Sequence, residues 1–199
     1  MGCLRNILRA IIITLAAVGF MSLGGKELVT KYIGYWLNPP QDVMLERAKK
    51  VGDFSQISEE FEIERAAGIM GYNAVVAEHK ASGQKFFVVD SNDKNILTKE
   101  DLQSDNVEEK LKDAVSKIKH QSVTFEELKI TKHGTLNSYG TNSPYVKFDA
   151  KVKKLPVGEI SGIISAVDTA SGEKRLLVAL NEKDKYSQLI SDEFFKKIK

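Results

Sequence analysis

Histidine, the residue type that most often binds metals or moves protons, occurs three times in this chain. His79, His120 and His133 lie 41 and 13 residues apart, and none belongs to an HExxH or a Cys-His pattern. Zinc sites draw their ligands from short, characteristic spacings. The sequence therefore predicts no zinc site, and the three histidines are expected to be ordinary surface or turn residues.

A second metal site to consider is a calcium loop. Asp90, Asn92 and Asp101 fall at the first, third and twelfth places of its register. However, Lys94 occupies a ligand place, and Asn95 stands where the loop needs glycine for its sharp turn. The pattern favours a solvated turn before a helix start, and we expect no metal and no cofactor.

Nucleophile and phosphate-binding motifs are also missing from the sequence. Ser82 and Ser171 lie in expected turns without a G-x-S-x-G elbow, and no glycine-rich phosphate loop follows an expected strand. Glu126 and Glu127 are adjacent, and adjacent residues of a strand point to opposite faces, so they are not expected to act on one substrate. The single cysteine, Cys3, lies at the N-terminus and leaves the rest of the chain without a thiol. We therefore expect no catalytic residues.

The composition of the chain is that of a globular protein, whose helices and strands would position any functional site. Its 199 residues are 42% hydrophobic and 28% charged, which suits one domain of ordinary size. The formal net charge is +2, and residues 1–37 carry four basic side chains and one acidic, so residues 38–199 have a net charge of −1. Because a nucleic-acid-binding domain needs a basic excess, we expect no nucleic-acid partner.

Residues 1–37 are expected to be directed to a membrane. Residues 10–25 form a run of 16 without a charge, closed by Arg9 and Lys26. A membrane-spanning helix needs about 20 apolar residues and the apolar region of a signal peptide about 7–15, so the length allows either an anchor or a cleaved signal. Pro39 and Pro40 end this segment, and the domain is expected to occupy residues 38–199.

The residues just after the apolar run favour retention in the membrane. Tyr32, Tyr35 and Trp36 lie where an aromatic belt is expected, and Lys26 and Lys31 can extend toward lipid headgroups, so we assign these five side chains to the membrane interface. Leaders of this shape most often export the domain behind them, which predicts a single-pass protein with an extracytoplasmic domain. The alternatives are secretion after signal cleavage, and a first helix that packs on the domain core.

Hydrophobic periodicity predicts an α+β fold with a mainly antiparallel sheet behind an N-terminal membrane helix. Helices are expected over residues 41–51, 55–67, 106–119 and 184–198, and about six strands over residues 72–79, 85–90, 123–132, 145–154, 159–168 and 174–180. Apolar and charged residues alternate in residues 145–154, which is typical of an antiparallel strand with one wet face. Residues 133–144, rich in Gly, Asn and Ser, are expected to form a loop.

Two segments of the chain are similar to each other. Residues 77–94 and 166–183 match at eight places around a Ser-Gly turn, and each is expected to be a hairpin with a helix downstream. A duplicated ββα unit would explain the match. Convergence would also explain it, because a Ser-Gly turn between apolar strands recurs for reasons of backbone geometry.

The first of these hairpins has a further likeness. In residues 72–102 a strand, a glycine turn, a second strand and an aspartate lead to an apolar pair, Ile96 and Leu97. This order resembles the hairpin of PepSY modules. The resemblance covers this stretch only and implies a local hairpin arrangement, without any activity.

The sequence supports two functional hypotheses. The first is a membrane-tethered, non-enzymatic binding or scaffold module, whose sheet face or residues 133–144 meet a protein or another component of the envelope. The second is a secreted or anchored enzyme or small-ligand carrier with a site assembled from distant residues, for which Tyr139, His133 and Glu126 are the polar candidates. The anchor and the nearly neutral domain favour the first.

Overall fold

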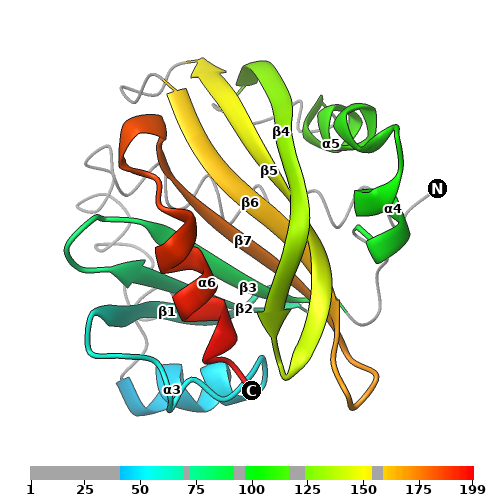
Figure 1. Ribbon diagram of the computed structural model, residues 1–199. Helices are drawn as coiled ribbons and strands as arrows, with labels where there is room; N and C mark the ends of the chain where they lie inside the picture. The colour runs from blue at the N-terminus through cyan, green and yellow to red at the C-terminus, as the bar shows by residue number, and fades with distance from the viewer. Residues whose placement is uncertain (1–40, 70–71, 92–96, 117–123, 154–158) are drawn as a thin grey trace.

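The computed structural model describes residues 41–69, 72–91, 97–116, 124–153 and 159–199. Its centre is a seven-stranded antiparallel sheet with the strand order β1-β2-β3-β7-β6-β5-β4. Figure 1 shows α6 lying across one face of this twisted sheet, α3 at its lower end, and α4 and α5 beside β4 and β5. The predicted α+β fold with an antiparallel sheet is confirmed for this part of the chain.

The strands are β1 (Phe61–Ile69), β2 (Tyr72–His79), β3 (Lys85–Asp90), β4 (Thr124–Ser138), β5 (Thr141–Lys153), β6 (Glu159–Asp168) and β7 (Lys174–Glu182). The helices are α3 (Gln41–Lys49), α4 (Lys99–Gln103), α5 (Val107–Ser116), the 3-10 turn η1 (Lys183–Lys185) and α6 (Gln188–Lys196). The bounds predicted for residues 72–79, 85–90 and 159–168 agree with β2, β3 and β6.

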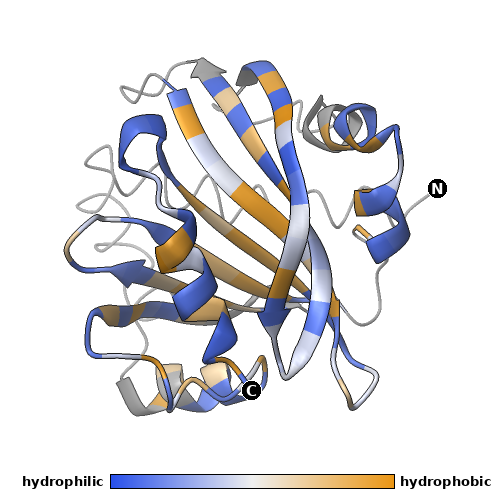
Figure 2. Cartoon of the chain, viewed as in Figure 1, coloured by the Kyte–Doolittle hydropathy of each residue, from blue (hydrophilic) through white to orange (hydrophobic). Residues whose placement is uncertain are grey.

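One face of the sheet, the α6 face, is covered by α6 and by residues at the end of α3. Phe194 and Phe195 of α6 are fully buried. The ring of Phe194 stacks on that of Phe86 in β3, with 4.3 Å between the centroids. Figure 2 shows apolar residues on the strands beneath α6. The apolar residues predicted to share one face of the last helix pack together on this core: Tyr186, Ile190, Phe194 and Ile198. The helix itself is shorter than the predicted residues 184–198, because Tyr186 precedes α6 and Ile198 follows it.

The opposite face, the α5 face, carries two smaller apolar clusters. In one, Leu102 of α4 and Leu111 of α5 pack with Val146 and Phe148 of β5. The other lies on β2, β3 and β7 and consists of Val76, Phe87, Val89, Leu176 and Val178. The alternation predicted for β5 is confirmed, because its apolar residues are buried on this face while Lys147, Asp149 and Lys151 keep part of their surface in solvent.

The helix predicted over residues 55–67 is wrong. Residues 55–60 form turns, and β1 follows as the seventh strand, paired with β2. A bulge between Ile63 and Arg65 changes the spacing of the inward residues Phe61, Ile63 and Ala66 from two to three, which imitates a helical period. Asp53, just before these turns, accepts the N–H of Ser55 at 2.8 Å through its side chain.

The loop predicted over residues 133–144 is also wrong, because β4 and β5 continue through it as a long hairpin. The connection consists of Tyr139 and Gly140, with φ angles of 52° and 68°. Two positive φ angles define a type I′ turn, whose twist matches that of the flanking strands. Gly134 within β4 makes room for the ring of Tyr145, its partner across the strands, since a Cβ there would lie 2.5 Å from that ring.

The two similar segments form neighbouring hairpins, β2–β3 and β6–β7. Because β3 pairs antiparallel with β7, with Val88 opposite Leu177, the two hairpins are related by an approximate twofold axis. The turn of the second hairpin is one residue shorter. The backbone N–H of His79 donates to the carbonyl of Gln84 in the first hairpin, whereas the N–H of Thr169 donates to the carbonyl of Glu173 in the second. The helices that follow lie on opposite faces of the sheet, α4 and α5 on one and α6 on the other. The structural similarity between the two segments is therefore limited to the hairpins and does not include the helices that follow them.

A polar junction joins the end of α3, the β4–β5 turn and the C-terminus. Arg175 of β7, only 2% exposed, donates from Nε to the Val51 carbonyl at 2.9 Å and from Nη1 to the Asp90 carboxylate at 3.2 Å. The Tyr139 hydroxyl donates to the same Val51 oxygen at 2.7 Å. These donors satisfy carbonyl groups that lack partners where a helix ends.

Gly162 of β6 is closely packed against the backbone of β7 and against a side chain of β5. A Cβ at this residue would lie 2.3 Å from the backbone oxygen of Ala179 and 2.9 Å from the ring of Phe148. Because the backbone of β7 cannot move aside as a side chain can, we expect Gly162→Ala to lower the free energy of unfolding by about 2 kcal/mol in urea denaturation. Gly140→Ala is the contrast, since a Cβ there meets nothing within 4 Å and only the positive φ opposes it. A loss of less than about 1 kcal/mol in the Gly162 variant would contradict this expectation.

Candidate functional site

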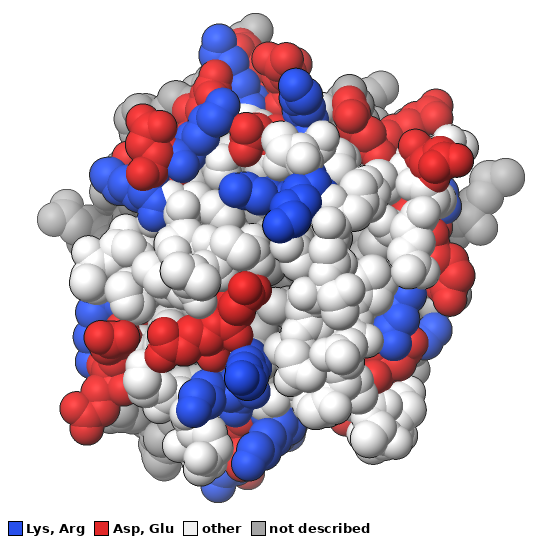
Figure 3. All heavy atoms as spheres, in the orientation of Figure 1, with Lys and Arg blue, Asp and Glu red and all other residues white. Residues whose placement is uncertain are grey.

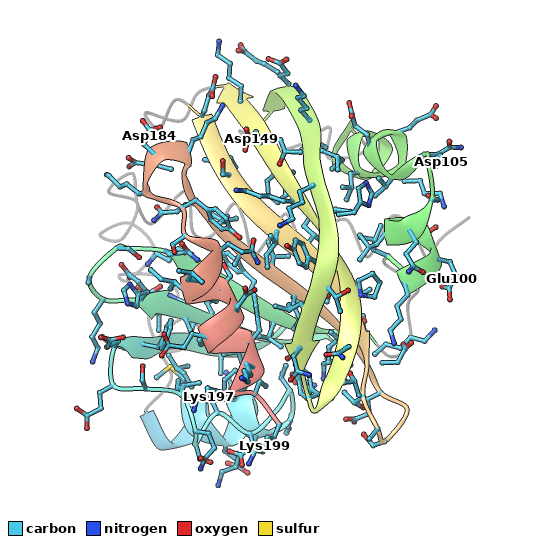
Figure 4. The ribbon with its side chains drawn as sticks, viewed as in Figure 1. Glu100, Asp105, Asp149, Asp184, Lys197 and Lys199 are labelled. Carbon is cyan, nitrogen blue, oxygen red and sulfur yellow. The ribbon has the colours of Figure 1, made fainter. Side chains whose placement is uncertain are left out.

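The charged end of the α6 face lies beyond α6, over β5, β6 and the start of η1. We call it the contact surface and define it by Lys147, Asp149, Ser161, Lys183 and Tyr186. Asp149 and Ser161 are paired across β5 and β6, and Lys183 immediately follows β7. Figure 3 shows charged side chains of both signs gathered toward the upper edge of this face, and Figure 4 places Asp149 there together with Asp184.

An ion-pair network holds the side chains of the contact surface. Lys183 Nζ lies 3.3 Å from Asp149 Oδ2 and 2.7 Å from Glu159 Oε2. The Ser161 hydroxyl, on a buried residue, donates to Asp149 Oδ1 at 2.5 Å. Beside this network, Lys147 Nζ lies 5.2 Å from the centre of the Tyr186 ring, in a cation–π arrangement. Residues from two strands and one turn are thus brought together.

The titration of these groups favours recognition over proton transfer. Burial raises the pKa of Asp149, but the hydrogen bond from Ser161 and the ammonium of Lys183 outweigh it, so the pKa lies below its usual value. The hydrogen bonds of Lys183 to Glu159 and Asp149 raise the pKa of its ammonium group. Both groups therefore stay charged near neutral pH, whereas a general acid or base works best with a pKa near the working pH. The arrangement can bind a polar or charged partner.

We expect Ser161→Ala to raise the pKa of Asp149, because the carboxylate loses a donor that favours its charged form. Since the pKa of Asp149 is lowered in the folded state, its contribution to stability is complete above the unfolded-state pKa of about 3.9 and is lost as the pH falls through the folded-state pKa. The variant should show a smaller loss of stability over that acidic range. Carboxyl titration by NMR measures the pKa directly, and an unchanged Asp149 curve would contradict the assigned role of Ser161.

The three polar candidates named from the sequence do not form a site together. Glu126 and His133 are exposed on the edge strand β4, seven residues apart, which is about 23 Å along a strand. Tyr139 lies at the far tip of the hairpin, where its hydroxyl is bonded to Val51. Burial raises the pKa of Tyr139 well above its usual value, so its hydroxyl stays protonated and serves the polar junction.

A Ser-His-Glu arrangement that sequence analysis missed lies where the β2–β3 hairpin meets Glu60, just before β1. The Ser82 hydroxyl lies 2.9 Å from Nδ1 of His79, whose ring is mostly buried beside Phe61. Nε2 of His79 lies 3.9 Å from a carboxylate oxygen of Glu60. The His-x-x-Ser spacing was the signal in the sequence. It could be interpreted only once the turn was known to fold the serine back onto the histidine.

The residues considered for calcium have structural roles. The carboxylate of Asp90 accepts a hydrogen bond from buried Arg175. Asp101 belongs to the capping box that starts α4, in which Thr98 accepts the Asp101 N–H and the Asp101 carboxylate accepts the Thr98 N–H. Asn92, Lys94 and Asn95 lie outside the described residues. Within the described ranges, no group of three or more His, Cys, Asp or Glu residues is placed to hold a metal ion.

The membrane-interface residues Lys26, Lys31, Tyr32, Tyr35 and Trp36 lie outside the described residues. Among the helices that the structure describes, none has the length and apolar character needed to cross a membrane. The division of the chain near residue 38 therefore stays a prediction.

Comparison with protein-family models gave no match for this chain. Comparison with curated protein sequences gave none either.

Proposed function

We propose that the protein is a membrane-tethered binding or scaffold module without enzymatic activity, with its domain on the extracytoplasmic side and the contact surface as its partner site. The observation that carries the proposal is the network around Lys183, in which ionised groups from separate strands are held in fixed positions at the end of a sheet face. Fixed charges of both signs, with the Tyr186 ring beside them, suit a protein partner in the envelope.

Site-directed crosslinking in native membranes tests the partner site. A photo-reactive residue replaces Lys147, which belongs to the contact surface, or Asp105, which Figure 4 places beside α5 at the right-hand edge of the domain. We expect a discrete crosslinked product from position 147 and none from position 105. Equal products from both positions, or none from either, would remove the support for this surface.

The tether and the sidedness require a separate measurement. We expect the native chain to keep residues 1–37 by intact mass, and a reporter fused to the C-terminus to be accessible from the extracytoplasmic side. A mature chain that begins near residue 25 would make the protein a secreted module, and a reporter accessible only from the cytoplasm would reverse the orientation.

A second function, acyl transfer at Ser82, is favoured by the Ser82–His79 contact. With the ring proton on Nε2, Nδ1 can accept the hydroxyl proton as Ser82 Oγ attacks an ester carbonyl, and that proton then leaves with the alcohol. Water would hydrolyse the acyl-serine in the same way. The loose contact between His79 and Glu60 would orient the ring.

A fluorophosphonate probe distinguishes this second function from the first. Ser171 is the matched control, because it occupies the equivalent turn of the β6–β7 hairpin and bonds to Thr169 and Glu173 instead of to a histidine. Acyl-transfer chemistry requires labelling at Ser82 that is lost in His79→Gln and unchanged in Ser171→Ala. If the probe does not label Ser82, the non-enzymatic module remains.

A further inference from the structure

A β-bulge in β4 brings two lysines to the same face of the sheet. In an unbroken strand, Lys129 and Lys132 would lie on opposite faces, because they are three residues apart. The register with β5 shifts between Ile130 and Lys132, so that Lys129 lies opposite Asp149 and Lys132 lies opposite Lys147. Since Lys147 and Asp149 share the α6 face, Lys129 and Lys132 lie on that face too. Bulges often occur where a strand has to redirect a functional side chain.

The bulge creates a group of three neighbouring lysines, Lys129, Lys132 and Lys147, which we call the lysine group. Side chains directly opposite each other, as in Lys132 and Lys147, have Cβ atoms about 5 Å apart. Lys129 is one ladder position further along the same face, about 7 Å away. Lys129 and Lys132 are exposed, and Lys147 is half-buried with its ammonium over the Tyr186 ring. Figure 3 shows basic side chains near the middle of this face, next to a wide uncharged area.

The acidic side chains around the lysine group make their contacts elsewhere. On β4, β5, α6 and the start of β6 they are Glu126, Glu127, Asp149, Glu159, Asp192 and Glu193. Lys183 contacts Asp149 and Glu159, Lys151 lies beside the two glutamates of β4, and Gln188 donates to Asp192. Among the described residues, no carboxylate forms an ion pair within 4 Å with the lysine group. Its arrangement, and not a net excess of charge, therefore distinguishes the lysine group.

The pairing of Lys132 with Lys147 is unfavourable for folding. Like charges directly opposite each other destabilise an antiparallel sheet. The cation–π contact with Tyr186 offsets this cost for Lys147, but Lys132 has no such contact. A local arrangement that opposes folding and serves no packing role is typical of a functional site.

We propose that the lysine group binds an acidic segment of the partner protein through its carboxylate groups. Alternate side chains of an extended segment are about 7 Å apart, which matches the spacing of Lys129 and Lys132. Complementary charges guide a partner to a surface and fix its register there. Asp149 and Glu159, at the border of the lysine group, would repel the continuous phosphate backbone of a nucleic acid. This inference rests on the proposed function, because it names the partner chemistry of the contact surface.

The binding test uses the full chain in detergent and a fluorescent ten-residue peptide in which glutamate and serine alternate. Fluorescence anisotropy should show binding that weakens about fivefold or more when Lys129→Gln and Lys132→Gln are combined. Raising the salt concentration to about 0.5 M should abolish the binding, because it screens the charges. A peptide with glutamine in place of glutamate should not bind. A ten-residue oligothymidylate that binds more tightly than the glutamate peptide would overturn the proposal in favour of phosphate recognition.

Two further variants separate binding from general charge and from folding. Lys196→Gln combined with Lys197→Gln is the matched control, because both lysines are exposed at the far end of α6, and it should retain peptide binding. Lys132→Glu places a carboxylate opposite Lys147, so it should raise the midpoint of urea denaturation while peptide binding is lost. Native binding by Lys132→Glu, or equal losses in the two glutamine pairs, overturns the proposal.

Crosslinking in native membranes distinguishes the failure of this inference from the failure of the proposed function. A photo-reactive residue replaces Thr131, which is exposed in the bulge, with or without the Lys129→Gln and Lys132→Gln changes. A product that falls about fivefold or more with these changes supports both. An unchanged product supports the partner site and overturns the role of the lysine group. If the chain with native lysines gives no product, the partner site loses its support, and peptide binding then decides about the lysine group.

Discussion

Arg175→Ala is expected to lower the free energy of unfolding by about 3–5 kcal/mol, the usual cost of removing one member of a buried ion pair. Arg175 is 2% exposed, and its guanidinium group donates to the Asp90 carboxylate and to the Val51 carbonyl. After the substitution, the Asp90 carboxylate loses its contact with the guanidinium group, and the Val51 carbonyl keeps only the donor from Tyr139. Urea denaturation, followed by circular dichroism, gives the change in free energy.

A double-mutant cycle tests whether the loss comes from the junction. Asp90→Asn should be clearly destabilising in the native background and less so in Arg175→Ala, because the guanidinium group that the carboxylate contacts is already gone. Arg175→Met keeps most of the side-chain volume, so a smaller loss than in Arg175→Ala separates the packing of the stem from the lost hydrogen bonds. Fully additive effects of Asp90→Asn and Arg175→Ala would show that the contact is energetically unimportant.

Phe194→Ala is expected to destabilise the domain by about 3–5 kcal/mol, through lost apolar burial and the cavity left behind. Phe194 is fully buried, and its ring lies against Phe86 of β3 and Phe61 of β1, with centroids 4.3 and 5.1 Å away. The side chain therefore joins α6 to strands from the other half of the chain. Thermal and urea denaturation should both show the loss.

Leu189 provides the matched control on the same helix. It is 80% exposed, so Leu189→Ala should change the free energy of unfolding by no more than about 0.5 kcal/mol. If the two variants lost similar stability, the orientation of α6 on the sheet would be wrong. Because α6 borders the contact surface, Phe194→Ala should also weaken partner crosslinking at position 147, whereas Leu189→Ala should leave it intact.

Several elements of this fold could be predicted from local sequence patterns alone. The hairpins β2–β3 and β6–β7 could be predicted because apolar strands flank glycine turns within a few residues, so the signal and the structure are both local. The existence of the last helix was predictable from the four-residue spacing of its apolar residues, although two of them, Tyr186 and Ile198, lie just outside α6. In each case, no distant residue was needed to choose between helix and strand.

Two elements depended on distant partners and were predicted wrongly. In β1, the bulge between Ile63 and Arg65 is a property of the pairing with β2, and before that pairing is known its spacing is typical of a helix. In β4, residues of low strand propensity are extended because β5 pairs with them along their whole length. The tight Tyr139-Gly140 turn that starts this pairing lacks the usual Asn-Gly signal.

The candidate functional sites show the same difference between what local sequence predicts and what distant pairing decides. Lys147, Asp149, Ser161 and Lys183 have no motif in common, and they meet because β5, β6 and β7 are adjacent and their even spacing brings these side chains to one face. Conversely, Tyr139, His133 and Glu126 were grouped by side-chain type, as polar candidates for a site assembled from distant residues, and an extended strand separates them. Side-chain type predicts which chemistry is available, and strand register decides which groups can act together.

The sequence by itself determined the division of charge, the apolar run of residues 10–25, the absence of cysteine chemistry beyond Cys3, and the local hairpins and final helix. These features depend on composition and on periods of two to four residues. Tertiary structure alone decided that β1 is a strand, that Arg175 is buried in a junction, and that Asp149, Ser161 and Lys183 meet on one face of the sheet. Each of these depends on which distant segments share a register or a core, and that choice is made by the free energy of the whole fold.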